Sequence, residues 1–128
     1  MIWLWVALGS ALGGVGRYTC SALAARWIGD TFPYGTLLVN VLGSFAIGAF
    51  AALAAPEGRL LVPTAARQFV MIGLCGGFTT FSTFSLETLR MLHDGEWLKA
   101  ASNATLMLLL CFVAVWAGYA LGTHWSES

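Results

Sequence analysis

The chain has 128 residues, of which 59% are hydrophobic and 9% are charged, and its formal net charge is zero. Soluble domains carry about 25% charged residues, so this composition would expose large apolar patches in water and instead favours a protein that lies in a lipid bilayer. The equal numbers of basic and acidic residues exclude the basic stripe that nucleic-acid binding requires.

The first apolar stretch runs from Ile2 to about Ala25 and contains one charge, Arg17. Because a helix needs about 20 mostly apolar residues to cross a membrane, we predict a helix over about 2–27. Residues 22–24 resemble a signal-peptide cleavage site, but no Lys or Arg precedes the apolar stretch, so we expect this helix to be retained. Arg17 could draw anions into a watery vestibule, snorkel to the interface or pair with Glu87.

The second stretch, Tyr34 to Ala55, carries no charge and follows a Gly- and Pro-containing turn. It predicts a helix over about 34–55. The stretch contains Asn40, whose side-chain amide offers two donors. Burying that amide without partners would cost roughly 2–7 kcal/mol. Asn40 therefore either binds a ligand or joins two helices, and the sequence leaves both possibilities open.

The third stretch predicts a helix over about 67–92 and contains a polar cluster, residues 73–85, in which three glycines precede five hydroxyl side chains. Glycine lowers helix stability, and carbonyls freed at a break could coordinate a cation. Alternatively, the glycines allow close packing and the hydroxyls bond back to their own helix.

Three phenylalanines, Phe78, Phe81 and Phe84, recur at every third position of this cluster and are expected to stack along one side. Phenyl ring edges are electropositive and could solvate a small anion. Such an aromatic stripe is also typical of plain packing.

The fourth stretch carries no charge from Ala100 to about Thr123 and predicts a helix over about 98–123. In lipid all four stretches must be helices, because a strand would leave its backbone groups unpaired. The sequence thus predicts one all-α membrane domain over residues 1–128.

The basic residues give almost no preferred orientation. Arg59 and Arg67 would lie on one side of the membrane, and Arg26, Arg90 and Lys99 on the other. Orientation follows the Lys/Arg bias, so such a chain could insert in both directions and pair in antiparallel fashion as an inverted repeat. A single orientation set by other factors is the alternative.

Small residues at i,i+4 spacing permit close helix contact, namely Gly9 with Gly13 and Ser44 with Gly48. Since four helices make a thin bundle, we expect oligomerisation.

No constellation of catalytic side chains is present. The sequence has no Ser/His/Asp set and no phosphate-binding loop. The three cysteines, Cys20, Cys75 and Cys111, are far apart within apolar runs and form no zinc-binding pattern. We therefore expect no enzymatic activity.

Several segments resemble a known family. Residues 76–87 (GGFTTFSTFSLE) closely resemble the third-helix signature of the Fluc (CrcB-type) fluoride channels. Residues 35–43 (GTLLVNVLG) resemble its second-helix signature, and residues 16–18 (GRY) look like its first-helix segment with an arginine. The resemblance covers essentially the whole chain.

The resemblance implies a fluoride-selective channel in the cell (inner) membrane, a multi-pass protein that exports cytoplasmic fluoride passively and so gives fluoride resistance. It implies four transmembrane helices with a break in the third, in an antiparallel, dual-topology homodimer with two fluoride pathways.

The resemblance also implies roles for individual residues. Phe81 and Phe84 would present ring edges to fluoride, and Asn40 would donate along the same path. A central Na⁺ would be held by backbone carbonyls, and the remaining positions would complete the polar track and a vestibule. The residues concerned are Ser82 and Thr83 in the polar track, Arg17 near the vestibule, and Gly76 and Thr79 at the sodium.

One segment departs from the family pattern. The family usually carries a serine or threonine midway along the fourth helix, whereas residues 106–117 contain no hydroxyl and Cys111 is the only candidate. Two other functions compete with the channel. A small multidrug exporter would need a carboxylate within a span, and Glu87 comes late in its helix. A membrane scaffold would leave the hydroxyl and phenylalanine cluster unexplained.

Overall fold

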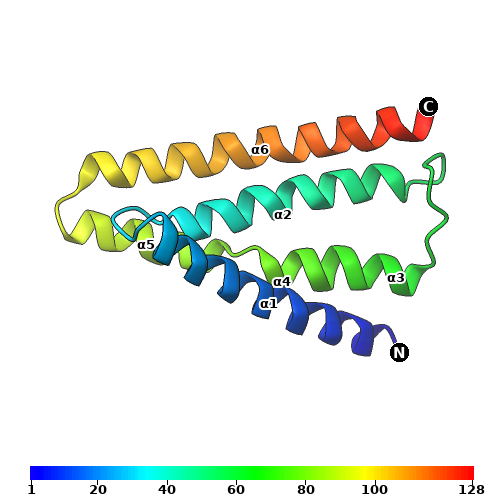
Figure 1. The fold of residues 1–128 in the computed structure, drawn as a ribbon, viewed down its shortest axis with the longest axis horizontal. Coiled ribbons are helices and arrows are strands. Elements are labelled where there is room, and N and C mark those ends of the chain that lie inside the picture. The colour runs from blue at the N-terminus through cyan, green and yellow to red at the C-terminus, as the bar shows by residue number, and fades with distance from the viewer.

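The computed structural model describes residues 1–128, which form helices joined by turns, with no strand (Figure 1). The third predicted helix is divided into several segments, one of which is a π-helix, η1. The elements are α1 (Ile2–Trp27), α2 (Tyr34–Leu53), α3 (Thr64–Gln68), η1 (Phe69–Cys75), α4 (Gly76–Phe78), α5 (Phe81–His93) and α6 (Trp97–Glu127).

The long helices lie side by side, with α2 packed along α6 and α1 packed against η1 and α4 (Figure 1). Both termini and the α2–α3 connection lie at one end of the bundle, and the α1–α2 and α5–α6 connections lie at the other. The basic residues are therefore divided between the two ends as the sequence predicted.

Three helical segments are long and apolar enough to cross a membrane: Tyr34–Leu53, Thr64–His93 and Trp97–Glu127. The expected fourth segment, α1, has 26 residues but does not meet the same criterion. Arg17, Tyr18 and several glycine and tryptophan residues make it less apolar than the others. The composition and the three spans together identify a multi-pass, all-α membrane protein.

The α2 helix ends at Leu53, two positions before the predicted end at Ala55. The chain turns there because the Leu53 carbonyl accepts a hydrogen bond from the amide of Leu60 at 2.8 Å, and the Ala55 carbonyl accepts one from Gly58 at 2.7 Å. The backbone of Ala54 has already left the helical region of φ and ψ.

Glycines bring α1 and the third helix into backbone contact. A Cβ atom added at Gly9 would lie 2.9 Å from the Cα of Gly73, and one added at Gly13 would lie 2.8 Å from the amide nitrogen of Phe78. A Cβ added at Gly77 would lie 2.7 Å from the carbonyl oxygen of Ser10. These small residues allow the close approach that holds helices together in lipid.

Glycines also join α2 to α6. A Cβ added at Gly48 would lie 3.1 Å from the amide nitrogen of Tyr119, and one added at Gly122 would lie 2.7 Å from the carbonyl oxygen of Ala49. Gly9, Gly13 and Gly48 are therefore in contact with helices of their own chain. These glycines therefore do not support the expected oligomerisation, because helices of the same chain already cover them.

The α1 contact leads to a stability prediction. Gly13→Ala should lower the thermal unfolding midpoint in detergent, since an added methyl meets backbone atoms and overpacking costs about 1–3 kcal/mol. Gly14→Ala is the matched control, because nothing lies within 4 Å of a Cβ at that position. Equal midpoints for the two variants, measured by circular dichroism, would contradict the close packing of α1.

Candidate functional site

The site is built around an interruption between α4 and α5. Thr79 has φ −90° and ψ 158°, and Thr80 has φ −152° and ψ 122°, so both residues are extended. The Thr80 hydroxyl oxygen caps α5 by accepting a hydrogen bond from the amide of Thr83 at 3.3 Å. Preceding glycines weaken the helix, and a threonine at the cap position favours a new start.

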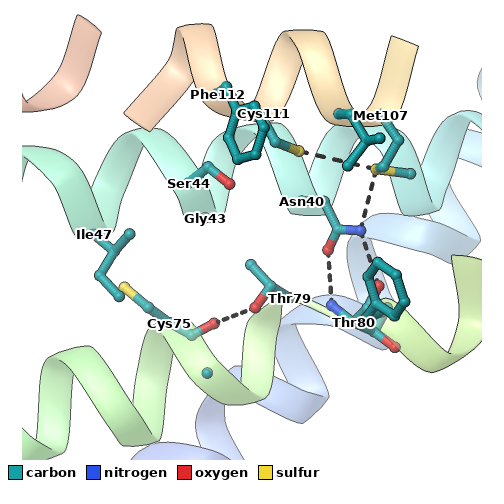
Figure 2. A pocket seen from close by; sticks show the side chains of 13 residues that line it. Asn40, Gly43, Ser44, Ile47, Cys75, Thr79, Thr80, Met107, Cys111 and Phe112 are labelled. Carbon is teal, nitrogen blue, oxygen red and sulfur yellow. Dashed lines mark hydrogen bonds between the residues drawn. The ribbon is translucent and has the colours of Figure 1, made fainter. Parts of the chain in front are cut away.

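Asn40 of α2 binds the backbone of Thr80 through both ends of its amide (Figure 2). Its Nδ2 donates to the Thr80 carbonyl at 2.9 Å, and its Oδ1 accepts from the Thr80 amide at 2.7 Å. The same Nδ2 also donates to Sδ of Met107 on α6 at 3.3 Å. The buried amide thus joins α2, the interruption and α6, which is the linking role that was one of its two predicted roles. It also satisfies backbone groups that the interruption frees.

Three hydroxyls form a connected row at the start of α5. The Thr80 hydroxyl donates to Oγ1 of Thr83 at 3.2 Å and lies 3.4 Å from Oγ of Ser82. By contrast, Ser85 and Thr88 donate back to carbonyls of their own helix. Thr83 donates its own hydroxyl hydrogen to no group in the chain, so that hydrogen is free for an acceptor.

Phe81 and Phe84 pack edge to face, with ring centroids 5.3 Å apart and an interplanar angle of 68°. Phe84 is buried, whereas Phe81 is 70% exposed. Phe78 does not continue this pair as the threefold spacing predicted. Its ring atoms lie 3.5 and 3.4 Å from Cβ atoms added at Gly16 and Gly43. The helical period is broken between Phe78 and Phe81 by two extended residues, so the expected stack of three rings is wrong.

A cavity of about 270 Å³ lies between α2, the interruption and α6 (Figure 2). It brings together Asn40, Gly76, Thr79 and Phe81 from the predicted set, and leaves out Arg17, Ser82, Thr83 and Phe84. Its lining residues are Asn40, Gly43, Ser44, Ile47, Cys75, Gly76, Thr79, Thr80, Phe81, Met107, Leu108, Cys111 and Phe112.

The fourth helix lines this cavity with Cys111, its one candidate from the sequence, and with three residues that the sequence did not indicate. Met107, Leu108, Cys111 and Phe112 line it together. Their spacing places them on one face of α6, and that periodicity is the signal that could have identified Met107 beside Cys111. Thr80 was also not assigned, although its place three residues before Thr83 suits a helix cap.

Arg17 lies at the contact between α1 and α4. It is half-buried, and its Nε donates to the carbonyl of Gly77 at 3.2 Å. The suggested pairing with Glu87 is not formed, since the ion pair in the structure joins Lys99 to Glu96 at 2.9 Å. Arg17 therefore fixes α1 next to the interruption.

The carbonyl oxygen of Thr79 accepts no hydrogen bond in the structure. The other polar groups of Thr79 are engaged, because its amide and its hydroxyl both donate to the Cys75 carbonyl at 3.0 Å. At membrane depth a free carbonyl requires a partner from water, an ion or another chain.

The sequence pattern of a known family, described as "CrcB-like protein, Camphor Resistance (CrcB)", matches residues 4–119. The chain belongs to the CrcB-like family. Its relatives include a "Fluoride-specific ion channel FluC" of Opitutus terrae, 58% identical over 92% of this chain and 89% of the relative. Proteins of the same name from Methylocella silvestris and Rhodospirillum rubrum are 51% and 50% identical, over 93% of this chain and 91% and 92% of their own lengths.

CrcB-like membership confirms the family that the segments in the second and third helices indicated. The family match spans α1 through most of α6, so it includes every residue of the cavity.

Proposed function

We propose that this chain forms a fluoride-selective ion channel that passively exports cytoplasmic fluoride and so gives fluoride resistance. Its relatives are named as fluoride-specific ion channels. The observation that carries the proposal is the row of hydroxyls at Thr80, Ser82 and Thr83 beside the exposed ring of Phe81. This arrangement offers donors and a ring edge to an anion and has no group suited to catalysis.

Fluoride is small and strongly hydrated, so a pore must replace many hydrogen bonds with water. Free hydroxyl hydrogens can replace some of them, and the positive edges of Phe81 and Phe84 can replace others. The amide of Asn40 would have to exchange its bond with Thr80 or Met107 for one with fluoride. A narrow path lined by such donors favours fluoride over chloride, which is larger and more weakly hydrated.

We also propose that two chains pair in opposite orientations and that each pathway is completed by the partner. Phe81 borders the cavity, yet its ring is 70% exposed. A second chain would cover this ring, and the even distribution of basic residues permits both orientations. In each chain of the pair, α1 would be the fourth membrane-crossing helix, and Arg17 would hold it against α4.

The interruption suits a sodium ion at the centre of the pair. The Thr79 carbonyl is without a partner, and the exposed Gly76 borders the same cavity. Unwound backbone carbonyls are the ligands that Na⁺ takes in ion-coupled membrane proteins. The carbonyls of Gly76 and Thr79 from both chains would hold the ion, whose charge would offset that of two nearby fluorides.

Sodium removal tests the ion and the pairing together. Protein purified and reconstituted throughout in sodium-free buffers should lose most of its fluoride flux and part of its dimer, measured by efflux and by size-exclusion chromatography with light scattering. Restoring Na⁺ but not K⁺ should recover both. Unchanged flux and dimer content without Na⁺ would contradict this assignment.

Growth tests the physiological role. In an acidic medium, fluoride enters cells as neutral HF, which dissociates inside. A cell without a fluoride exporter therefore accumulates the anion. Expression of this chain in bacteria that lack their own fluoride exporter should permit growth at a fluoride concentration that stops the empty-vector strain. Absence of rescue, with the protein detected in the membrane, would count against fluoride export.

A further inference from the structure

Sulfur atoms form part of the wall of the cavity. Cys111 and Met107 lie one turn apart on α6, and the Cys111 thiol donates to Sδ of Met107 with the sulfurs 3.9 Å apart (Figure 2). Cys75 lines the same cavity from the third helix. Thiol and thioether sulfurs are soft ligands that select monovalent copper and similar ions over hard cations.

We propose that Cys111 and Met107 form a binding site for a soft monovalent cation of the Cu⁺ or Ag⁺ type. Ligands bound at a metal–sulfur distance of about 2.3 Å can lie at most about 4.6 Å apart. The observed separation of 3.9 Å is below that limit, so the two side chains, one turn apart on α6, need only rotate apart to place an ion between their sulfurs. Binding replaces the thiol proton: the S–H bond of Cys111 breaks, the proton leaves to solvent, and the thiolate binds the cation.

Charge explains why a monovalent ion suits this position. One thiolate and one monovalent cation give a neutral complex, whereas a divalent ion would leave a net positive charge in the apolar surroundings of α6. Burial of an uncompensated charge is strongly unfavourable. A monovalent ion here needs no second ionised side chain.

The occupied site would block the fluoride pathway, a consequence that rests on the proposed function. Met107 Sδ also accepts a hydrogen bond from Asn40, which in turn holds the backbone of Thr80. An ion that occupies the sulfur competes with this bond and fills space in the cavity. The metal site itself is independent of fluoride conduction.

Binding is measured first, with Ag⁺ as the probe in chloride-free buffer. Because the chain has three cysteines, Cys20→Ser and Cys75→Ser are combined so that Cys111 is the sole thiol. Equilibrium dialysis against a competing thioether should give one Ag⁺ per chain. Met107→Leu is then added to this single-thiol variant. It conserves the side-chain volume and keeps the Cys111 thiol, and it should weaken Ag⁺ binding at least tenfold. Equal affinity with and without Met107 would overturn the two-sulfur site.

Flux is measured second, with each variant compared with its own rate before Ag⁺ is added. Micromolar Ag⁺ should block fluoride efflux in the wild type and in the Cys20→Ser variant, because Cys20 lies on α1 and does not line the cavity. Block should be lost in Cys111→Ser. Persistent block in Cys111→Ser would overturn the proposed consequence. Sulfur-dependent binding in a protein that conducts no fluoride would leave the metal site standing and refute the channel function instead.

Discussion

Fluoride efflux is expected to fall at least about tenfold in Phe81→Ile, a change equivalent to about 1.4 kcal/mol in the transport barrier. Isoleucine retains apolar bulk but has no ring, so it cannot present a positive edge to an anion. The Phe81 ring is 70% exposed and packs edge to face with Phe84, so its loss removes little packing within the chain. Efflux from liposomes containing equal amounts of dimer measures the effect.

The matched control for this change is Phe45→Ile. Phe45 is a partly exposed ring on α2 that does not line the cavity. The Phe45→Ile variant should conduct fluoride at the wild-type rate. If Phe81→Ile also conducts at that rate, the ring of Phe81 takes no part in conduction and the proposed pathway must be moved.

Asn40→Asp should abolish fluoride flux. An ionised aspartate has no N–H group, so it can donate neither to the Thr80 carbonyl nor to Met107, and it places a negative charge in the cavity. An anion entering the cavity would meet a like charge, and the Thr80 carbonyl would lose its partner. Single-channel recording or liposome efflux on folded protein should show a fluoride flux about a hundredfold lower, which corresponds to about 3 kcal/mol in the transport barrier.

The control for a buried carboxylate is Asn103→Asp. Asn103 is fully buried on α6, donates to Thr88 and does not line the cavity. This variant should lose stability but keep its flux per folded chain. Wild-type conduction by a folded Asn40→Asp dimer would show that fluoride does not pass close to Asn40.

The placement of the helices followed closely from the sequence because membrane crossing imposes a length and an apolar composition. The turn at residues 29–33 and the loop at 56–63 contain glycine, proline and charge, and the helices end at them. The first helix fits this rule in length but not in composition. Arg17 and the glycines of α1 make contacts with η1 and α4, and they reduce the hydropathy of the helix.

The site was only partly predictable. Glycines followed by threonines indicated where the third helix would weaken, and the extended pair Thr79–Thr80 lies within that segment. The sequence could not reveal that both ends of the Asn40 amide bind Thr80, because that contact joins residues 40 positions apart. The stack of three phenylalanines was wrong for a related reason, since a helical period holds only while the helix continues.

The direct test of the channel is fluoride efflux from liposomes that contain the purified protein, followed with a fluoride electrode after addition of a potassium ionophore. Chloride-loaded liposomes from the same preparation are the control. Rapid fluoride release with little chloride release is the predicted result. Release of neither ion from vesicles that contain folded dimer, or equal release of both, would contradict a fluoride-selective channel.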